Sequence, residues 1–378
     1  MKVVAIIDSF KGSMTSLEGG FAALDGIKRV VPDAEVIVKP ISDGGEGLVD
    51  SLTEGMGGRY EFVKVKNPLG EEITAKYGIA DGTAIIEMSA AAGIFLIPAS
   101  KLNPAVTTTY GVGEMIKDAI KKGCRNFIIG IGGSATNDAG LGMLEALGFE
   151  FYDENNKKVP WGAFAPGKVE KIVTDGVLPE LYECTFNIAC DVDNPLCGER
   201  GCSAVYGPQK GAKKEDIAVF DAAMAHFGEV TKKYNPKSDI MYPGAGAAGG
   251  MGFAFLSYLN GTLKSGIELV LEQIKAEKFI KDADLVITGE GKMDFQTVMG
   301  KVPVGVAKLA KKHGKTVIAF AGGVTHDAAE CNKHGIDAFF PIVRTPCTLE
   351  DAMKVENAKN NMSDCAEQAI RLWMAGRK

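Results

Sequence analysis

The chain of 378 residues carries 42 basic and 48 acidic side chains, a formal net charge of −6. No basic run is longer than a Lys-Lys pair, so the electrostatic footprint of a nucleic-acid-binding protein is missing. No run of about 18 apolar residues is present, and the N-terminus opens on a strand-like segment where a signal peptide would need a longer apolar stretch. We therefore expect a cytoplasmic monomer or homodimer that binds neither nucleic acid nor membrane.

The N-terminal segment has the pattern of a βαβ unit. Residues 2–7 and 34–39 are short apolar runs of the kind found in buried parallel strands. Between them, Thr15 and Glu18 spell a capping box, which predicts the start of a helix. Loops at residues 8–15 and 40–47 follow the two strands and should therefore open on the same edge of the sheet.

The pattern changes near residue 60 and returns to parallel strands near residue 284. Short β-rich pieces separated by turn residues fill residues 61–88, which is typical of hairpins. We predict an α/β fold in which residues 1–66 and 261–378 form a Rossmann-like parallel-sheet domain. Residues 67–260 would form a second, mixed α/β domain inserted into the first, with the active site in the cleft between them.

A glycine loop in the middle of the chain, Gly130 to Gly140, follows an apolar strand and precedes an expected helix. Its glycines allow close approach of a ligand to backbone N–H groups, and the helix should turn its positive end toward the same place. Ser134, Thr136, Asn137 and Asp138 add oxygen ligands. The loop lacks the Lys-Ser or Lys-Thr of a P-loop. It fits the looser G-x-G-x-x-A dinucleotide pattern, but the Asn-Asp pair favours a metal-bridged phosphate.

A literal G-x-G-x-x-G at Gly244, Gly246 and Gly249 follows a polar segment where a dinucleotide fingerprint needs an apolar strand. More informative are three loops of the predicted parallel-sheet domain that place acids beside glycine. The first loop carries Asp8 and Lys11, the second carries Asp43 and Glu46, and the third carries Glu290 and Asp294. Ligands of open α/β sheets bind at the carboxyl ends of the strands, so these side chains should converge. Carboxylates for magnesium, N–H-rich turns and lysines together favour phosphoryl transfer.

The ordered set of loops resembles the bacterial glycerate kinase family of the type I kind, from the first strand to about Val306. The resemblance rests on Asp8-Ser-Phe-Lys-Gly-Ser, Pro40-Ile-Ser-Asp-Gly-Gly-Glu-Gly, Gly130-Ile-Gly-Gly-Ser-Ala-Thr-Asn-Asp, Asp191-Val-Asp-Asn-Pro-Leu, Tyr206-Gly-Pro-Gln-Lys-Gly, Pro243-Gly-Ala-Gly-Ala-Ala-Gly-Gly and Gly289-Glu-Gly-Lys-Met-Asp. It implies ATP- and Mg²⁺-dependent phosphorylation of D-glycerate, with 2-phosphoglycerate favoured over 3-phosphoglycerate. Two positions depart from the family pattern: Ala139, where glycine is more usual, and Lys292, where arginine is usual.

Roles for individual residues follow from what the reaction needs. A hydroxyl that attacks phosphorus must lose its proton to a nearby base, and we assign this role to Asp191, with Lys11 as the second catalytic residue. Ser9, Asp193 and Arg200 are expected to contact glycerate, whose carboxylate would bind Arg200 or Lys11. The alternative is that the two aspartates only cap the Asn194-Pro195 turn.

For the cofactor we expect ATP on Gly132, Gly133, Ser134, Thr136 and Asn137, with Gly289 and Glu290 in support. We expect magnesium near Asp43 or Asp294. The competing hypothesis is a nicotinamide-dependent dehydrogenase of a small hydroxy acid, which rests on the two G-x-G patterns alone.

Overall fold

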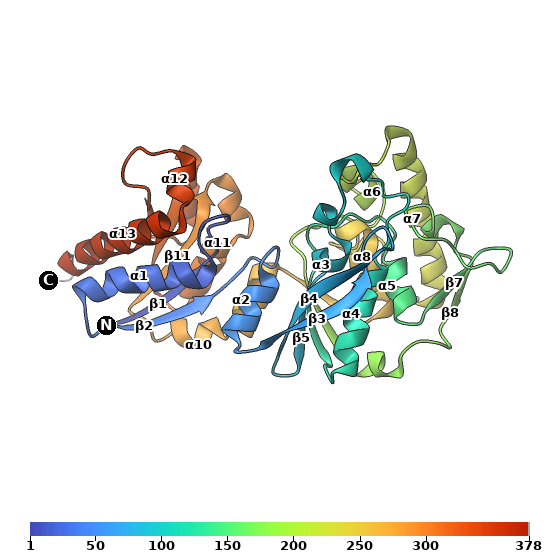
Figure 1. The fold of residues 1–378 in the computed structure, drawn as a ribbon, viewed down its shortest axis with the longest axis horizontal. Helices are drawn as coiled ribbons and strands as arrows, with labels where there is room; N and C mark the ends of the chain where they lie inside the picture. The colour runs from blue at the N-terminus through green and yellow to red at the C-terminus, as the bar shows by residue number, and fades with distance from the viewer. Residues whose placement is uncertain (377–378) are drawn as a thin grey trace. The chain divides into compact units, whose positions relative to one another are not determined.

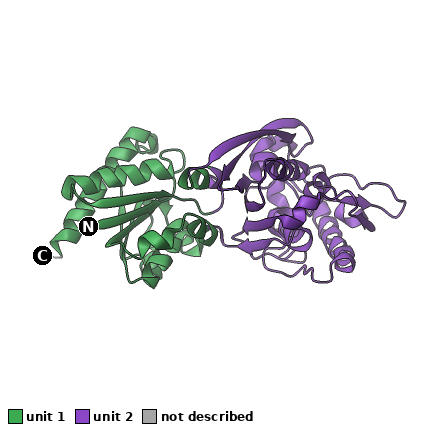
Figure 2. Cartoon of the chain, turned by 90° about the horizontal axis from the view of Figure 1, so that it is seen from below, with its two compact units in different colours: residues 1–43, 50–56, 267–378 green, residues 44–49, 57–266 purple. Residues whose placement is uncertain are grey.

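The computed structural model describes residues 1–376, and the chain separates into two compact units. Unit 1 comprises residues 1–43, 50–56 and 267–378, and unit 2 comprises residues 44–49 and 57–266 (Figure 2). The sequence placed the boundaries at 66 and 260. Strand β3 (Arg59–Lys66), which that prediction gave to the first domain, pairs along its length with β4 (Glu72–Ala80) and so lies in unit 2. Within residues 1–376, no helix is long and apolar enough to cross a membrane.

Unit 1 is built on a five-stranded sheet in which every neighbouring pair is parallel, in the order β13-β12-β11-β1-β2. Its strands are β1 (Lys2–Ile7), β2 (Glu35–Pro40), β11 (Leu285–Met293), β12 (Thr316–Val324) and β13 (Ala338–Pro341). Numbered by their order along the chain, they follow the doubly wound sequence 2-1-3-4-5, in which the strand order reverses between β1 and β11. The parallel α/β fold predicted from sequence is confirmed.

Helices cover both faces of this sheet (Figure 2). They are α1 (Ser16–Val30), α2 (Leu48–Gly55), α9 (Gly266–Gln273), α10 (Ala276–Ile280), α11 (Val302–Lys312), α12 (Leu349–Met353) and α13 (Val355–Ala375), with 3₁₀ turns η6 (Phe295–Met299) and η7 (His326–His334). Helix α1 packs against α13, and both contribute to the apolar core with β1 and β11 (Figure 1). The predicted capping box at Thr15 and Glu18 is present in both directions.

Unit 2 contains a six-stranded mixed sheet in the order β10-β9-β6-β5-β4-β3. The hairpin strands β3, β4 and β5 (Thr83–Glu87) pair antiparallel, whereas β5, β6 (Asn126–Gly130), β9 (Thr185–Ala189) and β10 (Thr262–Lys264) pair parallel. A separate antiparallel pair joins β7 (Glu150–Tyr152) and β8 (Lys171–Val173). The helices are α3 (Ser89–Ala92), α4 (Tyr110–Lys121), α5 (Leu141–Ala146), α6 (Cys202–Tyr206), α7 (Lys214–Tyr234) and α8 (Ala247–Tyr258).

Candidate active site

A cavity of about 500 Å³ opens in unit 1 where several strands of its sheet end. It is lined by residues that follow β1 and β2 and by the last residues of β11 and β12. The charged lining residues are Asp8, Lys11, Asp43, Glu290, Lys292 and Lys301, and Ser9 lies beside them. The structure thus brings together Asp8, Lys11, Asp43 and Glu290 of the six residues that the sequence predicted would converge, whereas Glu46 and Asp294 are not among the lining residues. The cavity lies where ligands of doubly wound sheets bind, at the reversal of strand order.

The most perturbed carboxylate of this cavity belongs to Asp8. Burial and the neighbouring charge of Asp43 raise its pKa to about 7, and Glu290 adds to the rise, although the Ser9 N–H and Lys11 favour the ionised form. The Ser9 N–H donates to Asp8 Oδ1 at 2.7 Å. An uncompensated negative charge at this position is therefore costly, and a bound cation would relieve it.

We expect Asp8→Asn to stabilise the protein above pH 7 in the absence of metal. Between the ordinary carboxyl pKa of 3.8 and the folded value of about 7, the native state binds a proton that the unfolded state has released, so wild-type stability falls as pH rises. The asparagine side chain does not ionise, so the variant does not lose this stability as pH rises. Its Tm in EDTA should exceed that of the wild type at pH 8, by about 2–4 °C per kcal/mol of relief, and should equal it below pH 4.

Asp282, exposed in unit 1, provides the control. Asp282→Asn should change Tm equally at both pH values. A lower Tm for Asp8→Asn than for wild type at pH 8 would mean that the ionised carboxylate is stabilising and that its electrostatic attraction to Lys11 dominates.

Glu290 and Asp294 both accept hydrogen bonds from residues of η6, but their carboxylates differ in their other neighbours. Glu290 is 5% exposed, accepts a hydrogen bond from Thr297 Oγ1 and lies 3.8 Å from Lys301 Nζ. Asp294 caps η6 by accepting from the Gln296 N–H, and its carboxylate lies 3.1 Å from Lys292 Nζ. Asp294 is not among the residues that line the cavity. Its predicted role as a magnesium ligand stays a prediction, and the structure gives its carboxylate a capping role.

Gly289 lies inside the sheet, whereas the sequence placed the segment around Glu290 in a loop. Strand β11 continues to Met293 because β12 runs beside it as far as Val324. The Gly289 carbonyl accepts from the Asp8 N–H, and a Cβ at this position would meet the Phe320 carbonyl oxygen at 2.3 Å. Close strand packing therefore explains this glycine without a ligand, and its predicted contact with ATP stays a prediction.

The glycine loop of unit 2 exposes Gly132 and Gly133 at the end of β6. A Cβ on Gly132 would find no atom closer than 4.0 Å, and one on Gly133 would lie 3.6 Å from Ser89 Cβ, an ordinary contact. Gly133 has a φ of +73°, a conformation that favours glycine. Packing does not require glycine at either position, so the close approach of a ligand can explain why both positions lack a side chain.

We expect Gly133→Val to raise the KM for ATP or abolish activity while the protein stays folded. The positive φ costs a β-branched side chain about 1–2 kcal/mol, and the side chain would cover the exposed backbone N–H groups. Gly132→Ala is the cleaner companion because its backbone needs no positive φ and its Cβ meets open space. Steady-state kinetics with circular dichroism would decide. Unchanged ATP kinetics in both folded variants would contradict nucleotide binding by this loop.

Beneath the exposed glycines, the loop turns into the interior of unit 2. Thr136 and Asn137 are fully buried, and Asn137 Nδ2 donates to Ser203 Oγ at 3.0 Å. Lys210, 2% exposed, donates from Nζ to the Thr136 carbonyl oxygen at 2.6 Å, and its burial lowers its pKa to about 8. The Thr136 carbonyl and the Asn137 side chain thus anchor the loop in the interior of unit 2, while Gly132 and Gly133 form its accessible surface.

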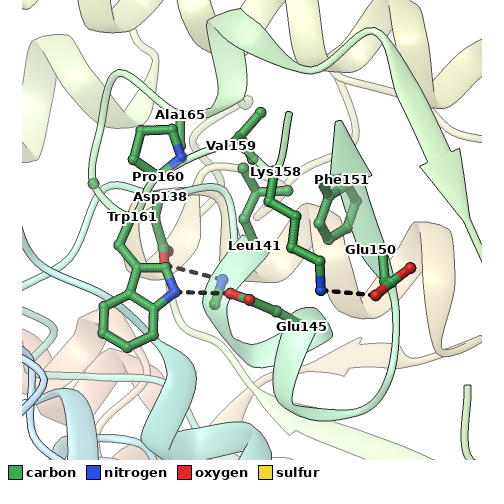
Figure 3. Close-up of a pocket in the computed structure, with 12 residues that line it drawn as sticks. Asp138, Leu141, Glu145, Glu150, Phe151, Lys158, Val159, Pro160, Trp161 and Ala165 are labelled. Atoms are coloured by element: carbon green, nitrogen blue, oxygen red, sulfur yellow. Dashed lines mark hydrogen bonds and ion pairs between the residues drawn. The ribbon is translucent and has the colours of Figure 1, made fainter. Parts of the chain in front are cut away.

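Asp138, which the sequence offered as a cation ligand, is instead a structural residue. Its carboxylate is buried and accepts from the Thr109 N–H and Oγ1 and from the N–H groups of Gly140 and Gly142. These last two donors lie at the start of α5, so Asp138 satisfies N–H groups at the positive end of that helix. Asp138 and Trp161 both line a cavity of about 10 Å³, which has room for no more than a water molecule (Figure 3).

The run of glycines from Gly244 to Gly252 packs against this same loop. A Cβ on Gly249 would lie 2.1 Å from the Thr136 carbonyl oxygen, and the Ala139 N–H donates to the Gly249 carbonyl. Ala139 itself has a φ of +54°, which accounts for the preference for glycine at this position. The literal G-x-G-x-x-G therefore serves backbone packing. This removes one of the two G-x-G patterns on which the hypothesis of a nicotinamide-dependent dehydrogenase rests.

Asp191, Asp193 and Arg200 lie in the segment that follows β9 in unit 2, and all three are exposed. Asp191 Oδ1 accepts from Ser265 Oγ at 3.1 Å and from the Gly266 N–H at 2.9 Å. Arg200 Nη2 lies 2.8 Å from Asp193 Oδ1, with both side chains about two-thirds exposed or more. An ion pair this exposed contributes little stability, so the arginine can exchange this partner for another anion.

Three residues stand out in the structure that the sequence left without a role. Asp8 was recognised only as one acid of a loop, although its raised pKa marks it as a functional candidate. Lys301 lines the cavity beside Glu290, and Lys210 supports the glycine loop. The only sequence signal for Lys210 was its place in Tyr206-Gly-Pro-Gln-Lys-Gly, since burial of a lysine cannot be recognised from its neighbours.

Comparison with known proteins agrees with this architecture along the whole chain. The model of the glycerate kinase family matches residues 3–374. "Glycerate kinase" of Haemophilus influenzae is 46% identical over 374 residues, 98% of each chain, and "Glycerate 2-kinase" of Escherichia coli is 45% identical over 356 residues, 94% of this chain and 93% of the relative. A crystal structure of "putative glycerate kinase 2" from Salmonella typhimurium LT2 superimposes with a TM-score of 0.92 at 41% sequence identity. The superposition covers 100% of this chain and 99% of the Salmonella chain. The chain therefore belongs to the glycerate kinase family.

Proposed function

We propose that the protein transfers the γ-phosphoryl group of ATP to D-glycerate. The observation that carries the proposal is the strand-end cavity of unit 1, in which carboxylates and lysines gather, in a chain of the glycerate kinase family. The Escherichia coli relative carries the name glycerate 2-kinase, and we extend its regiochemistry to this chain, which would release 2-phosphoglycerate.

Magnesium suits the donors of this cavity. Among residues 1–376 no three His, Cys, Asp or Glu side chains are grouped closely enough to hold a metal ion alone. Magnesium in nucleotide sites is usually held by one or two carboxylates together with phosphate oxygens and water, and Asp43, with Glu290 or Asp8, supplies such a set. The ion would neutralise phosphate charge during transfer. Lys11, Lys292 and Lys301 would bind phosphate oxygens.

Asp191 is proposed as the base that accepts the proton of the attacking hydroxyl. Two donors, Ser265 Oγ and the Gly266 N–H, contact its Oδ1 and would hold the carboxylate in a fixed orientation. Arg200, exchanging its exposed bond to Asp193, would bind the glycerate carboxylate in the bidentate geometry that guanidinium favours, and Ser9 stays a predicted glycerate contact. Gly132, Gly133 and Ser134 would donate backbone N–H groups to phosphate.

A coupled assay of ADP release over a panel of hydroxy acids tests the proposal. D-Glycerate should give turnover well above the rate with lactate or water, and removal of magnesium with EDTA should abolish it. Equal ADP release with D-glycerate, lactate and water would remove glycerate as the acceptor. Hydride transfer from a hydroxy acid to NAD⁺, in place of phosphoryl transfer, would restore the dehydrogenase hypothesis.

A further inference from the structure

The unit 1 cavity has an apolar side that the proposed chemistry leaves without a function. Phe10 comes from the loop after β1, Ile342 and Val343 follow β13, and Leu349, Ala352 and Met353 belong to α12. Met353 Cε lies 2.6 Å from where a Cβ on Gly12 would stand. Helix α12 therefore rests directly on the loop that carries Asp8 and Lys11, and the apolar and charged linings belong to one cavity.

Glycerate does not match this apolar side. It is a three-carbon acid in which every carbon bears oxygen, so it offers no apolar surface to bury. The cavity, at about 500 Å³, falls in the range of about 300–1,000 Å³ that suits ligands of drug size. Leu349 is 75% exposed although it lines the cavity, and a ligand with a flat apolar part would cover it. The lining therefore fits a larger molecule that is apolar at one end and anionic at the other.

We propose that this cavity binds the nucleoside of ATP, with the purine base against Val343 and the α12 residues Leu349, Ala352 and Met353. The proposal rests on the proposed function, which supplies a nucleotide as the second substrate. The triphosphate then lies toward Lys11, Lys292 and Lys301, and the metal lies by Asp43 and Glu290. Base, phosphates and metal each meet a lining of matching chemistry in this cavity, in addition to the N–H groups that Gly132 and Gly133 would offer to phosphate.

The strand ends support this orientation. Gly322 and Gly323 near the end of β12 line the cavity together with Gly291 of β11. A Cβ on Gly323 would meet no atom within 4 Å, so packing does not require glycine there, and the bare backbone leaves room for a ligand. The cavity also spans the reversal of strand order between β1 and β11, the position at which doubly wound sheets bind nucleotides.

Calorimetry with two probes separates the base from the phosphates. ADP and inorganic tripolyphosphate are each titrated, with magnesium present, into wild type, Ala352→Phe and Ala329→Phe. The phenylalanine at 352 occupies the proposed base position, whereas Ala329 is exposed on η7 and does not line the cavity. Tripolyphosphate carries the charge without the base and so also reports whether each variant is folded.

Wild type should bind ADP more tightly than tripolyphosphate. Ala352→Phe should weaken ADP binding and raise the KM for ATP by about tenfold or more, the equivalent of about 1.4 kcal/mol. It should leave tripolyphosphate affinity and the KM for glycerate within about twofold of wild type, and Ala329→Phe should change none of these values. A rise in the glycerate KM with ATP kinetics unchanged would overturn the proposal, as would equal wild-type affinities for the two probes.

The two proposals fail separately. Tight, Ala352-dependent binding of ADP without glycerate-dependent turnover would support the nucleoside site and reject the glycerate kinase activity. Normal turnover with glycerate combined with unchanged ADP binding in Ala352→Phe would keep the activity and reject the site.

Discussion

Replacing Asp191 with asparagine is expected to lower kcat by about 10²–10⁴, the usual effect of removing a positioned general base. The amide keeps the size of the side chain and can still accept from Ser265 Oγ and the Gly266 N–H through its oxygen, so binding and folding should be preserved. The KM values for ATP and glycerate should therefore change little. Steady-state kinetics over a range of magnesium concentrations measures all three quantities.

Asp43→Asn and Asp294→Asn are the comparison variants, and both are predicted to raise the magnesium concentration needed for half-maximal rate. Asp8→Asn tests the rival base, since its pKa of about 7 is close to the value that suits proton transfer near neutral pH. Rescue of Asp191→Asn by high magnesium would make Asp191 a metal ligand. A magnesium-independent loss of kcat confined to Asp8→Asn would move the base to unit 1.

Asp138→Ala is expected to destabilise unit 2 by about 3–5 kcal/mol, because it leaves several buried donors without an acceptor. The carboxylate accepts at 2.9 Å from both the N–H and Oγ1 of Thr109, and at 3.1 and 3.3 Å from the N–H groups of Gly140 and Gly142. A loss of this size should lower Tm by about 6–20 °C. Thermal unfolding followed by circular dichroism provides the measurement.

Asp138→Asn separates this structural role from metal binding. The asparagine oxygen can still accept some of these bonds, so its Tm should lie between those of Asp138→Ala and wild type, and its magnesium requirement should equal that of wild type. A nearly normal Tm for Asp138→Ala with an increased magnesium requirement would restore Asp138 as a cation ligand.

The sequence predicted those features that depend on local pattern. The capping box at Thr15 and Glu18 and the parallel strands of unit 1 follow from residues close in the chain. The gathering of Asp8, Asp43 and Glu290 at one sheet edge follows from the place of each at or near the carboxyl end of a strand. Such patterns can be recognised from residue spacing, turn residues and the order of the strands.

The sequence could not separate ligand-binding residues from buried ones of the same type. Asp138 looks like a cation ligand until Thr109, 29 residues earlier, is found to donate to it. Gly249 belongs to a literal dinucleotide pattern, but the Thr136 carbonyl lies against it, and the Phe320 carbonyl gives Gly289 a packing role that the sequence did not show. In each case the deciding neighbour is distant in the chain, and an Asp or Gly favoured by turns looks the same in both settings.

Phosphorus NMR of the reaction mixture identifies both the acceptor and the position of transfer. With purified protein, ATP, Mg²⁺ and D-glycerate, we expect the γ-phosphate signal to be replaced by one phosphomonoester, that of 2-phosphoglycerate, in equal amount to the ADP formed. A 3-phosphoglycerate signal would correct only the position of transfer. ADP accompanied by inorganic phosphate alone, or ATP left intact, would contradict the assignment of this protein as a kinase of glycerate.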